Sequence, residues 1–528
     1  MVSPAGRLGD SAGRLAILLI AAACAWLLAF FSLAGMRRIL TVIPDDAGYF
    51  FGIAENLARG QGFTFDRLHP TNGFQPLWQF LLAGLAYISG LRLESLFRVG
   101  LLFQVLLLAA CGLALFRLHR RAYPGEVNLL GAVLFVFLAL IPAANGMESA
   151  PLLFTLTALF AWFCRTGRGP RGEPFRPGFV LGLLLALVVL ARLDTIFLPV
   201  VVFSWALLQT VRGRIRAAEF SMCAVGFLLP VAPYLLFNKL CFGAFMPISG
   251  MLKTTFPHLA LDETVLAGIS RRHYFFAASA LVYLVWHFAT RKRMTTLSGY
   301  RTFFSRALPF LAAGVVLHFL HVILFMDWAV FRWHFASYDL FFALAVCEPA
   351  AESLSGRRAR IVRPLILVCS MLLLAAGTAV VYRRSVRPLD SVWSVAAYDA
   401  ALWTRQNTAG DAVLAMKDAG FFGYFSDRRV INLDGVVNSA GYQEVLRQKH
   451  LGAYLRENGV SCLAQHAVWD SDSVVSGAYD TYRLVYPSRL YADCSDTLTV
   501  SRKAEVYRSK PYYDGPYRTV FLIWRFPG

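Results

Sequence analysis

The apolar residues of this chain form long runs up to about residue 381 and only short runs after it. Several of the long runs approach the roughly 20 residues that a helix needs to cross a bilayer. We predict eleven membrane helices, at about residues 15–36, 99–116, 128–144, 149–164, 178–193, 195–210, 219–237, 273–289, 307–326, 337–350 and 364–381. The first run is too long, and too poor in a small-residue cleavage site, for a removed signal peptide, so we expect a retained first span.

The last part of the chain, residues 382–528, has a different pattern. It holds 18 Lys or Arg and 15 Asp or Glu, with no long apolar run. Short strand-like runs alternate with helical stretches, which predicts a small α/β domain with a mainly parallel sheet. The runs are strands at 413–416, 430–433 and 461–464, helices at 398–406 and 442–450, and added edge strands at 504–507 and 519–526. We therefore predict two domains, a transmembrane domain over 1–381 and a soluble domain over 382–528.

Composition supports this division. The 528 residues are 57% hydrophobic and only 16% charged, with a mean hydropathy of +0.54, which excludes a disordered chain, and the long apolar runs exclude a purely soluble enzyme. The formal charge of +19 could suggest nucleic-acid binding, but 21 of the 33 basic residues before residue 382 fall in alternate loops. That alternation is the positive-inside pattern. It places the N-terminus in the cytoplasm and the C-terminal domain outside, and it favours membrane lipid over nucleic acid as a partner.

The first outer loop, residues 37–98, contains a short apolar segment at 76–90. Because this segment is short for a span, we expect it to lie in the membrane interface, anchored by Trp78 and Tyr87. If it crossed the membrane, all later basic clusters would fall outside, against the charge pattern.

Two adjacent carboxylates, Asp45 and Asp46, follow the first span directly. One of them could cap a helix running over 47–59, but a cap accounts for only one carboxylate. The other interpretation is a general base whose neighbour orients a substrate or a metal. Spacing alone does not decide between the two.

The loop that follows contains His69, Asn72 and Gln75, just before the interfacial segment. These side chains could make ordinary loop hydrogen bonds. Amide and imidazole groups are also what a sugar-binding rim would present to hydroxyl groups. In the C-terminal domain, Cys462 and Cys494 are the only cysteines, and an oxidising compartment would favour a bond between them.

Further charged residues are predicted at the outer ends of the spans. Glu148 is either an exposed interfacial carboxylate or a substrate contact, and Arg192 and Asp194 are either a local ion pair or part of the same site. His318 and His321 share one face of the ninth span, where we favour polar contacts between helices over a metal site.

Two cations could bind phosphate at the outer surface. Lys253 follows an irregular segment that is too broken for a span, and Arg332 stands beside aromatic residues in a later outer loop. A cation at the membrane surface suits a lipid-borne phosphate. General headgroup contact is the alternative for both.

The order of these motifs resembles the GT-C class of membrane glycosyltransferases. The resemblance covers about residues 1–350 and rests on four blocks, namely Asp45-Asp46-Ala47, the 60–65 turn, Thr71-Asn72-Gly73-Phe74-Gln75-Pro76-Leu77-Trp78 and Gly146-Met147-Glu148-Ser149. Similar families are terminal arabinofuranosyltransferases, aminoarabinose transferases acting on lipid A, and protein O-mannosyltransferases. The stretch 403–438, with Lys417-Asp418-Ala419-Gly420 and Asn432-Leu433-Asp434-Gly435, resembles outer domains attached to some members.

This resemblance implies an inverting transferase in the bacterial inner membrane, with a polyprenyl-phosphate-sugar donor and a glycan, lipid or protein acceptor. Asp45 or Asp46 would be the base, and Lys253, with Arg332 in support, would balance the charge of the phosphate. A divalent cation shared by one of the aspartates and Glu148 is left open. The alternatives are a ligase with a polyprenyl-diphosphate donor and a transporter or flippase of lipid-linked sugars, although the latter would be expected to show internal repeats.

Overall fold

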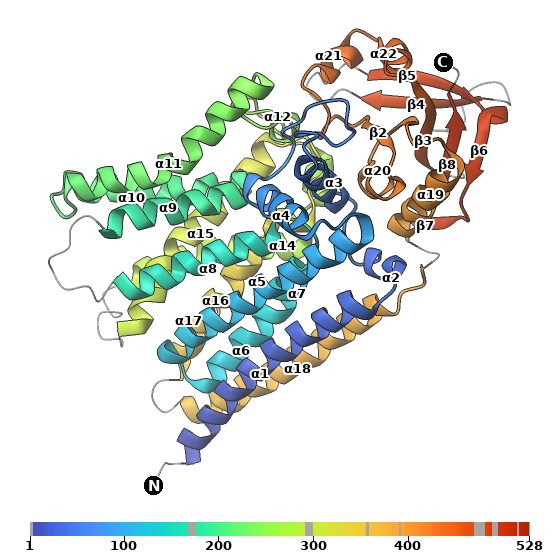
Figure 1. Ribbon diagram of the computed structural model, residues 1–528. Coiled ribbons are helices and arrows are strands. Elements are labelled where there is room, and N and C mark those ends of the chain that lie inside the picture. Colours follow the sequence, from blue (N-terminus) through green and yellow to red (C-terminus); the bar gives the residue numbers. More distant parts are fainter. Residues whose placement is uncertain are drawn as a thin grey trace.

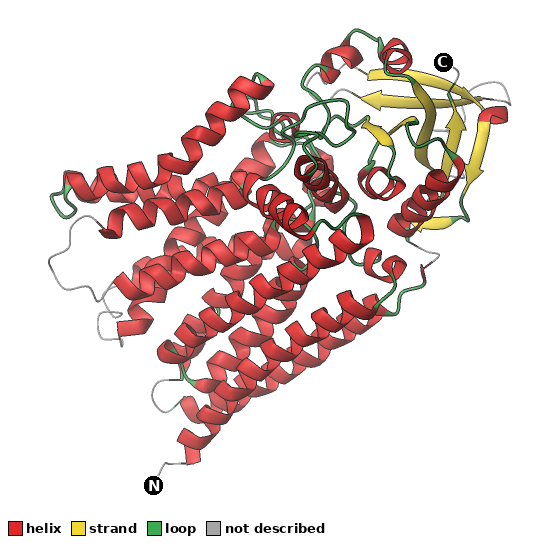
Figure 2. Cartoon of the chain, viewed as in Figure 1, coloured by secondary structure: helices red, strands yellow, loops and turns green. Residues whose placement is uncertain are grey.

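The computed structural model describes residues 4–166, 176–290, 299–354, 358–389, 392–468, 481–487, 495–514 and 517–526. In this part of the chain, a bundle of long helices carries a sheet domain at one end (Figure 1). The named strands all belong to the C-terminal part (Figure 2). The predicted fold class, a helical multi-pass membrane protein with a C-terminal α/β domain, is confirmed.

A helix lies at each of the eleven places where the apolar runs predict one. Their bounds are α1 (Pro4–Leu33), α5 (Leu93–Ala122), α6 (Gly125–Leu134) continued by η1 (Phe135–Leu140) and α7 (Ile141–Ala143), α8 (Ser149–Thr166), α9 (Arg176–Ala191), η2 (Leu193–Ile196) with α10 (Phe197–Val211), α11 (Ala217–Phe242), α14 (Arg271–Thr290), α15 (Gly299–Phe325), α16 (Ala336–Ala345) with α17 (Cys347–Ser353), and α18 (Ala359–Ser385). By length and composition, seven helices among the described residues could cross a membrane, and α8 and α9 are shorter apolar helices. Eleven crossings remain a prediction.

Glycines allow two of these helices to pack closely. A Cβ atom added at Gly182 of α9 would lie 1.9 Å from the carbonyl oxygen of Cys223 in α11, and one at Gly226 of α11 would lie 2.2 Å from that of Phe179 in α9. Side chains at these glycines would therefore push the two helices apart. Close backbone approach through small residues is a common way for helices to pack in a bilayer.

Short helices form the end of the bundle that carries the C-terminal domain, which is the predicted outer end. They are α2 (Met36–Leu40), α3 (Ala47–Ala58), α4 (Pro76–Ser89), α12 (Ile248–Lys253), α13 (Glu263–Gly268) and η4 (Arg332–Phe335). The predicted interfacial segment is α4, and the 76% exposure of Tyr87 at its end fits that interpretation. The anchoring role predicted for Trp78 is wrong. Its ring is fully buried, and its Nε1 donates a hydrogen bond of 2.9 Å to the carbonyl oxygen of Gly146.

The C-terminal domain is built on a mixed sheet with the strand order β2-β1-β3-β8-β6, in which β7 also pairs with β8. Its strands are β1 (Val413–Met416), β2 (Arg429–Asn432), β3 (Val460–Val468), β6 (Glu505–Arg508), β7 (Tyr512–Asp514) and β8 (Tyr517–Arg525), and a separate hairpin joins β4 (Thr481–Pro487) to β5 (Ser495–Ser501). Its helices are α19 (Trp393–Asn407), α20 (Gly420–Ser426), α21 (Tyr442–Arg447), α22 (Leu451–Glu457) and the short η6 (Arg502–Ala504).

The sheet departs from the prediction in two respects. The predicted mainly parallel sheet is wrong, because β8 pairs antiparallel with β3, β6 and β7. Strand β1 is parallel to β2 and to β3, as expected, but β8 runs antiparallel to β3 and lies inside the sheet. The predicted edge position of 519–526 is therefore wrong. Residues 519–524 of β8 are all buried, and a strand buried on both faces belongs to the interior of a sheet. Cys462 of β3 is buried, whereas Cys494 lies outside the described residues.

The C-terminal domain docks firmly on the outer end of the bundle (Figure 1). Ion pairs cross the boundary between Arg37 and Asp399 at 2.8 Å, and from Arg67 and Arg92 to Asp427 at 2.8 and 3.0 Å. Apolar residues from both domains also form one continuous buried cluster. The two predicted domains therefore pack as one body.

Candidate functional site

The carboxylate of Asp45 is held by the C-terminal domain. Its Oδ2 accepts a hydrogen bond of 2.8 Å from the backbone N–H of Gly420, and its Oδ1 accepts one of 2.8 Å from that of Phe421. Both amides belong to the first turn of α20, where N–H groups have no partner within the helix. Asp45 thus caps a helix of the other domain. The predicted cap on the 47–59 helix is not formed, because Asp46 occupies that position without a side-chain hydrogen bond.

Two glycines permit this close approach. A Cβ atom added at Gly48 in α3 would lie 2.2 Å from the carbonyl oxygen of Gly420, and one at Gly73 would lie 1.9 Å from the carbonyl oxygen of Val436. Neither position has room for a side chain. The backbone of the first outer loop therefore rests directly on the backbone of the C-terminal domain at two places.

A polar network next to Asp45 joins the two domains. The hydroxyl of Tyr49 accepts hydrogen bonds from the backbone N–H of Ala419 at 2.8 Å and from Nδ2 of Asn432 at 2.9 Å, and it donates to Oδ2 of Asp434 at 3.4 Å. Asp434 also accepts from the backbone N–H of Asp418 at 3.0 Å. These bonds fix the two loops of the C-terminal domain against α3.

Asp46 is in a different position from its neighbour. Its side chain is partly exposed, and it makes no hydrogen bond or ion pair with any described residue. It faces the charges of Lys253 and Asp434. Burial raises the pKa of Asp46 to about 6, the charge of Lys253 opposes that shift, and the charge of Asp434 adds to it. A carboxylate with this pKa can take up a proton near neutral pH.

Lys253 is the last residue of the short helix α12 and is partly buried. Over the described ranges its ammonium group has no hydrogen-bonded or ion-paired partner. Its charge acts on Asp46, Glu148 and His334, and in each case lowers the pKa. Lys253 therefore stands at a point where several outer segments meet.

Asn72 and Gln75 hold the segments around Lys253 and Arg192. The Oδ1 of Asn72 accepts a hydrogen bond of 3.0 Å from the backbone N–H of Ile248, the first residue of α12. The Oε1 of Gln75 accepts one of 2.9 Å from the backbone N–H of Leu193. In this structure both amides bind the chain itself, as the loop interpretation predicts.

His69 lies at the junction with the C-terminal domain. Its Nδ1 bonds to Oδ2 of Asp66 at 2.7 Å, and its Nε2 lies 3.1 Å from the hydroxyl of Tyr454. Its side chain thus bridges the first outer loop and α22. The structure does not bring His69 into contact with Asp46 or Lys253.

Glu148 and Arg192 form a buried ion pair between Oε1 and Nη1. Arg192 also pairs with Asp194 at 2.7 Å, and Asp194 lies 3.4 Å from Nε2 of His318. Burial raises the pKa of Glu148, and the guanidinium of Arg192 opposes the shift. The prediction of an exposed interfacial carboxylate at position 148 is wrong, because Glu148 is buried and only 2% exposed.

One atom of this network has no partner. The Oε2 of Glu148 is buried and accepts no hydrogen bond from the described protein groups. A buried carboxylate oxygen without a donor is costly, so a bound hydroxyl group would satisfy it. His318 continues the network through Nδ1, which lies 2.8 Å from the hydroxyl of Tyr338, and this is the predicted polar contact between helices.

Arg332 belongs to another cluster. It lines a cavity with Arg272, Arg384 and Asp339. Burial lowers the pKa of Arg332 to about 10, and the charges of Arg272 and Arg384 act in the same direction. The charge of Asp339 opposes that shift. The two predicted phosphate contacts, Lys253 and Arg332, therefore face different sets of charges.

The residues that could share a divalent cation do not fit one well. Both oxygens of Asp45 are occupied by backbone amides, so only Asp46 and the Oε2 of Glu148 could offer an oxygen to a cation, and Glu148 is already paired with Arg192. Among the described residues, no group of three His, Cys, Asp or Glu side chains is placed to hold a metal ion. We therefore derive no step through a cation.

Sequence reasoning missed three residues of the site, Tyr49, Asn432 and Asp434. A signal for two of them was present, because the Asn432-Leu433-Asp434-Gly435 motif stood out in the C-terminal domain. The missing information was that this loop docks beside Asp46. Tyr49, inside an apolar helical stretch, carried no signal of its own.

Comparisons with known proteins give the following similarities. Residues 385–508 match a family model described as a domain of unknown function, DUF8728. A comparison with curated proteins finds no match. Among solved structures, ArnT from Cupriavidus metallidurans bound to undecaprenyl phosphate has a TM-score of 0.47 at 13% identity, over 94% of this chain and 98% of that one.

A second similar structure is the arabinofuranosyltransferase AftD from Mycobacteria, with a TM-score of 0.45 at 13% identity. The match covers 98% of this chain and 40% of AftD, so this chain corresponds to less than half of that protein. The apo form of the Cupriavidus ArnT has a TM-score of 0.43 at 13% identity, over 95% of this chain and 98% of that one.

Proposed function

We propose that this protein is a membrane glycosyltransferase that moves a sugar from a polyprenyl-phosphate donor to a cell-envelope acceptor. The observation that carries the proposal is the pair formed by Asp46 and Lys253. Each side chain makes no hydrogen bond or ion pair with a described residue, and the charge of Lys253 acts on Asp46. A carboxylate and an ammonium group left unpaired at one partly buried site suit a base and a phosphate contact.

The reaction is an inverting displacement at the anomeric carbon of the sugar. The acceptor hydroxyl gives its proton to Asp46 as its oxygen attacks that carbon. The bond between the anomeric carbon and the phosphate oxygen breaks, and the polyprenyl phosphate leaves with the bonding electrons. Lys253 balances the charge that grows on the phosphate. General-base catalysis contributes about 10²- to 10⁴-fold in rate.

Asp46, and not Asp45, is the base in this mechanism. The two carboxylate oxygens of Asp45 accept hydrogen bonds from the backbone N–H groups of Gly420 and Phe421, so Asp45 has a structural role. The carboxylate of Asp46 has no such bond and has a pKa of about 6. A base with that pKa is largely ionised at neutral pH and still takes up a proton effectively.

Glu148 and Arg192 bind the sugar in this proposal. The unpaired Oε2 of Glu148 accepts a hydrogen bond from a sugar hydroxyl. Arg192 fixes the orientation of Glu148 through their ion pair and also donates to the carbonyl oxygen of Trp333 at 3.3 Å. The charge of Lys253 acts on Glu148, which is consistent with one site for sugar and phosphate.

The site faces the outside of the cell in this proposal. The distribution of basic residues favours a cytoplasmic N-terminus and a C-terminal domain outside the cytoplasm, and the family resemblance implies a bacterial inner membrane. A reporter enzyme fused after Gly528 should be active only outside the cytoplasm. Activity restricted to the cytoplasm would invert the orientation and remove the proposed acceptors.

The test is transfer of labelled sugar from defined polyprenyl-phosphate donors to cell-envelope extract by the purified protein. We expect product with at least one donor. Asp46→Asn should lower turnover by about 10²-fold or more, as for the loss of a base, while its expression matches that of the wild type. Absence of transfer with every polyprenyl-phosphate donor, or wild-type turnover in Asp46→Asn, would overturn the proposal.

A further inference from the structure

A cavity of about 550 Å³ adjoins the loops that carry the proposed site. Its walls come from α1, α7, α16 and α18 and from the loop before α3. Pro44 and Ser149 line it, whereas the nearby residues Asp46 and Glu148 do not. The cavity and the Asp46–Lys253 pair therefore have different lining residues.

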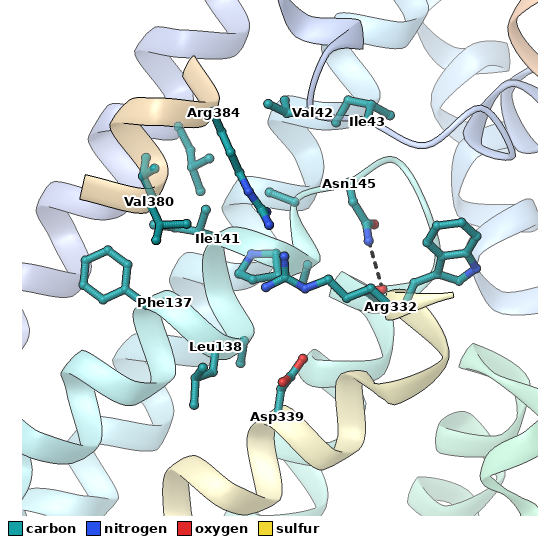
Figure 3. Close-up of a pocket in the computed structure, with 18 of the residues that line it drawn as sticks. Val42, Ile43, Phe137, Leu138, Ile141, Asn145, Arg332, Asp339, Val380 and Arg384 are labelled. Carbon is teal, nitrogen blue, oxygen red and sulfur yellow. Dashed lines mark hydrogen bonds between the residues drawn. The ribbon is translucent and has the colours of Figure 1, made fainter. Parts of the chain in front are cut away.

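Three arginines enter this cavity from different helices. Figure 3 shows the side chains of Arg332 and Arg384 pointing toward one another across it. Asp339 is the only carboxylate in the lining, and it is paired with Arg272 at 2.9 Å. Arg332 and Arg384 make no ion pair with any residue in the described ranges. The lining thus has a net charge of two positive units.

Two guanidinium groups that converge repel each other, and the carboxylate near Arg332, that of Asp339, is already paired with Arg272. The Nε of Arg332 is also buried and has no hydrogen-bond partner among the protein groups described. The pKa of Arg332 is lowered to about 10, first by burial and then by the neighbouring arginines. An anion between the two groups would remove the repulsion and satisfy the donor, and guanidinium groups suit phosphate oxygens in particular.

The rest of the lining is mainly apolar, although Thr41, Asn145, Ser149 and Ser385 also belong to it. Three apolar residues of the lining are also exposed at the surface of the bundle. They are Trp26 in α1 (38% exposed), Val42 in the loop before α3 (36%) and Val380 in α18 (51%). In a membrane protein, such residues at the end of a span face lipid. A ligand that enters from this side can place a hydrocarbon chain against the apolar wall and a phosphate at the arginines.

We infer that this cavity binds a lipid through its phosphate group, held between Arg332 and Arg384, at a place separate from the donor phosphate site at Lys253. The ligand class is a lipid monophosphate with a long hydrocarbon chain. A free phosphate ion has the same charged chemistry, but it would leave the apolar wall and the opening toward the membrane unused. The inference goes beyond the proposed function and does not depend on sugar transfer.

The test measures lipid bound to the purified full-length protein by native mass spectrometry. The probes are undecaprenyl phosphate, undecaprenol without the phosphate, and inorganic phosphate as a competitor. All measurements use a Lys253→Ala background, which removes the donor phosphate contact. Arg332→Gln and Arg384→Gln are compared with Arg383→Gln, an equal change in charge at a residue of α18 that does not line the cavity.

We expect Lys253→Ala protein to bind undecaprenyl phosphate, and the added Arg332→Gln or Arg384→Gln change to weaken binding at least tenfold. Arg383→Gln should stay within twofold, undecaprenol should bind at least tenfold more weakly, and a large molar excess of inorganic phosphate should not displace the lipid. Arg332→Lys, which keeps the charge, should restore part of the affinity.

Three results would each overturn the inference. The first is equal binding in the Arg332→Gln, Arg384→Gln and Arg383→Gln proteins. The second is equal affinity for undecaprenol, which would show a purely apolar groove. The third is displacement by inorganic phosphate, which would show a site for the free ion. If Arg332→Gln fails to fold, Arg384→Gln, at an exposed position, still decides the matter. Sugar transfer is not measured, so a failure of the proposed function would leave these results unchanged.

Discussion

The Oδ2 atom of Asp45 lies 2.8 Å from the backbone nitrogen of Gly420, a residue 375 positions further along the chain. This bond links the loop after the first span to the C-terminal domain, and the bond from Phe421 to Oδ1 repeats the link. The two adjacent aspartates thus have different surroundings. Asp45 is bonded to the C-terminal domain, and Asp46 faces Lys253. The C-terminal domain is therefore part of the structure that sets the position of Asp46.

The first prediction concerns the stability of this link. Asp45→Asn replaces one carboxylate oxygen by an NH₂ group, which faces a backbone N–H and cannot accept its hydrogen bond. We expect the free energy of unfolding to fall by about 2 kcal/mol, as for a lost bond to a charged acceptor. Thermal unfolding of the purified protein measures this. Asp46→Asn is the control, and an equal loss of stability in both variants would contradict the division of roles.

The second prediction tests the contact between the two backbones. Gly48→Ala places a Cβ atom 2.2 Å from the carbonyl oxygen of Gly420, so the C-terminal domain must move away. Gly84→Ala, in α4, meets no atom within 4 Å and is the matched control. Alanine favours a helix over glycine by about 1 kcal/mol, so the control should be neutral or stabilising.

Limited proteolysis of the C-terminal domain is the measurement for this pair. We expect faster cleavage and a lower melting temperature in Gly48→Ala, and wild-type behaviour or better in Gly84→Ala. Equal protection of the two variants would mean that the contact between Gly48 and Gly420 does not hold the domain in place.

The helical architecture could be predicted because apolar runs are long and local. Each of the eleven runs became a helix, since the cost of burying backbone groups in lipid leaves few other structures. The strand β1 was predicted at its observed bounds for a similar reason, as a short apolar run between turns. The interior position of β8 could not be predicted, because an edge strand and an interior strand can have similar sequences.

The candidate site could be predicted only in part. The motif around Asp45 and Asp46 pointed to the right loop, but the difference between the two residues depends on Gly420, in another domain. The role of Trp78 was mistaken because an aromatic residue in a short apolar helix fits both an interface and a core. Lys253 and Arg332 were similar as isolated cations, and tertiary packing placed them in separate clusters.

The third prediction concerns pH. Asp46 acts as a base only when ionised, and its pKa of about 6 predicts that kcat/KM rises with pH and levels off above that value. The charge of Asp434 raises this pKa, so Asp434→Asn should shift the rising limb to lower pH. The pH profile of sugar transfer measures the shift. A limb that does not move, or one that moves to higher pH, would contradict the assignment.

The same pKa has a consequence for stability. A carboxyl group whose pKa is higher in the folded protein than in the unfolded chain binds more protons when folded, so stability falls as pH rises from about 4 to about 6. Asp46→Asn removes this loss of stability at high pH, because asparagine does not titrate. We expect that variant to be more stable than the wild type above pH 6, by about 1 kcal/mol or more, because one pKa unit corresponds to about 1.4 kcal/mol. Equal stability of the two proteins across this range would mean that Asp46 has an ordinary pKa.

The fourth prediction concerns the buried pair of Glu148 and Arg192. Arg192→Met leaves the carboxylates of Glu148 and Asp194 without their main partner, and breaking a buried ion pair in this way costs about 3–5 kcal/mol. Glu148→Gln should lower the free energy of unfolding by less, because Arg192 keeps its ion pair with Asp194. Thermal unfolding of the two variants checks this order. A larger loss in Glu148→Gln would show that Arg192 depends on Glu148 alone.

The last prediction concerns the phosphate of the donor. Lys253→Ala removes the ammonium group that faces Asp46 and Glu148, so we expect the donor KM to rise and kcat to fall, each about tenfold or more. Lys253→Arg should recover part of both, because the charge remains while its geometry changes. The control is Lys239→Ala, the other lysine of the predicted outer loops, whose Nζ instead bonds to the carbonyl oxygen of Gly243 at 2.9 Å.

Steady-state kinetics with varied donor separates the two interpretations of Lys253. If Lys253 only touches lipid headgroups, Lys253→Ala and Lys239→Ala should both stay within a few-fold of the wild type. If it holds the leaving phosphate, Lys253→Ala alone should lose kcat, since the interaction strengthens as the phosphate gains charge. A change in KM without a change in kcat would place Lys253 in donor binding and leave the leaving group to another cation.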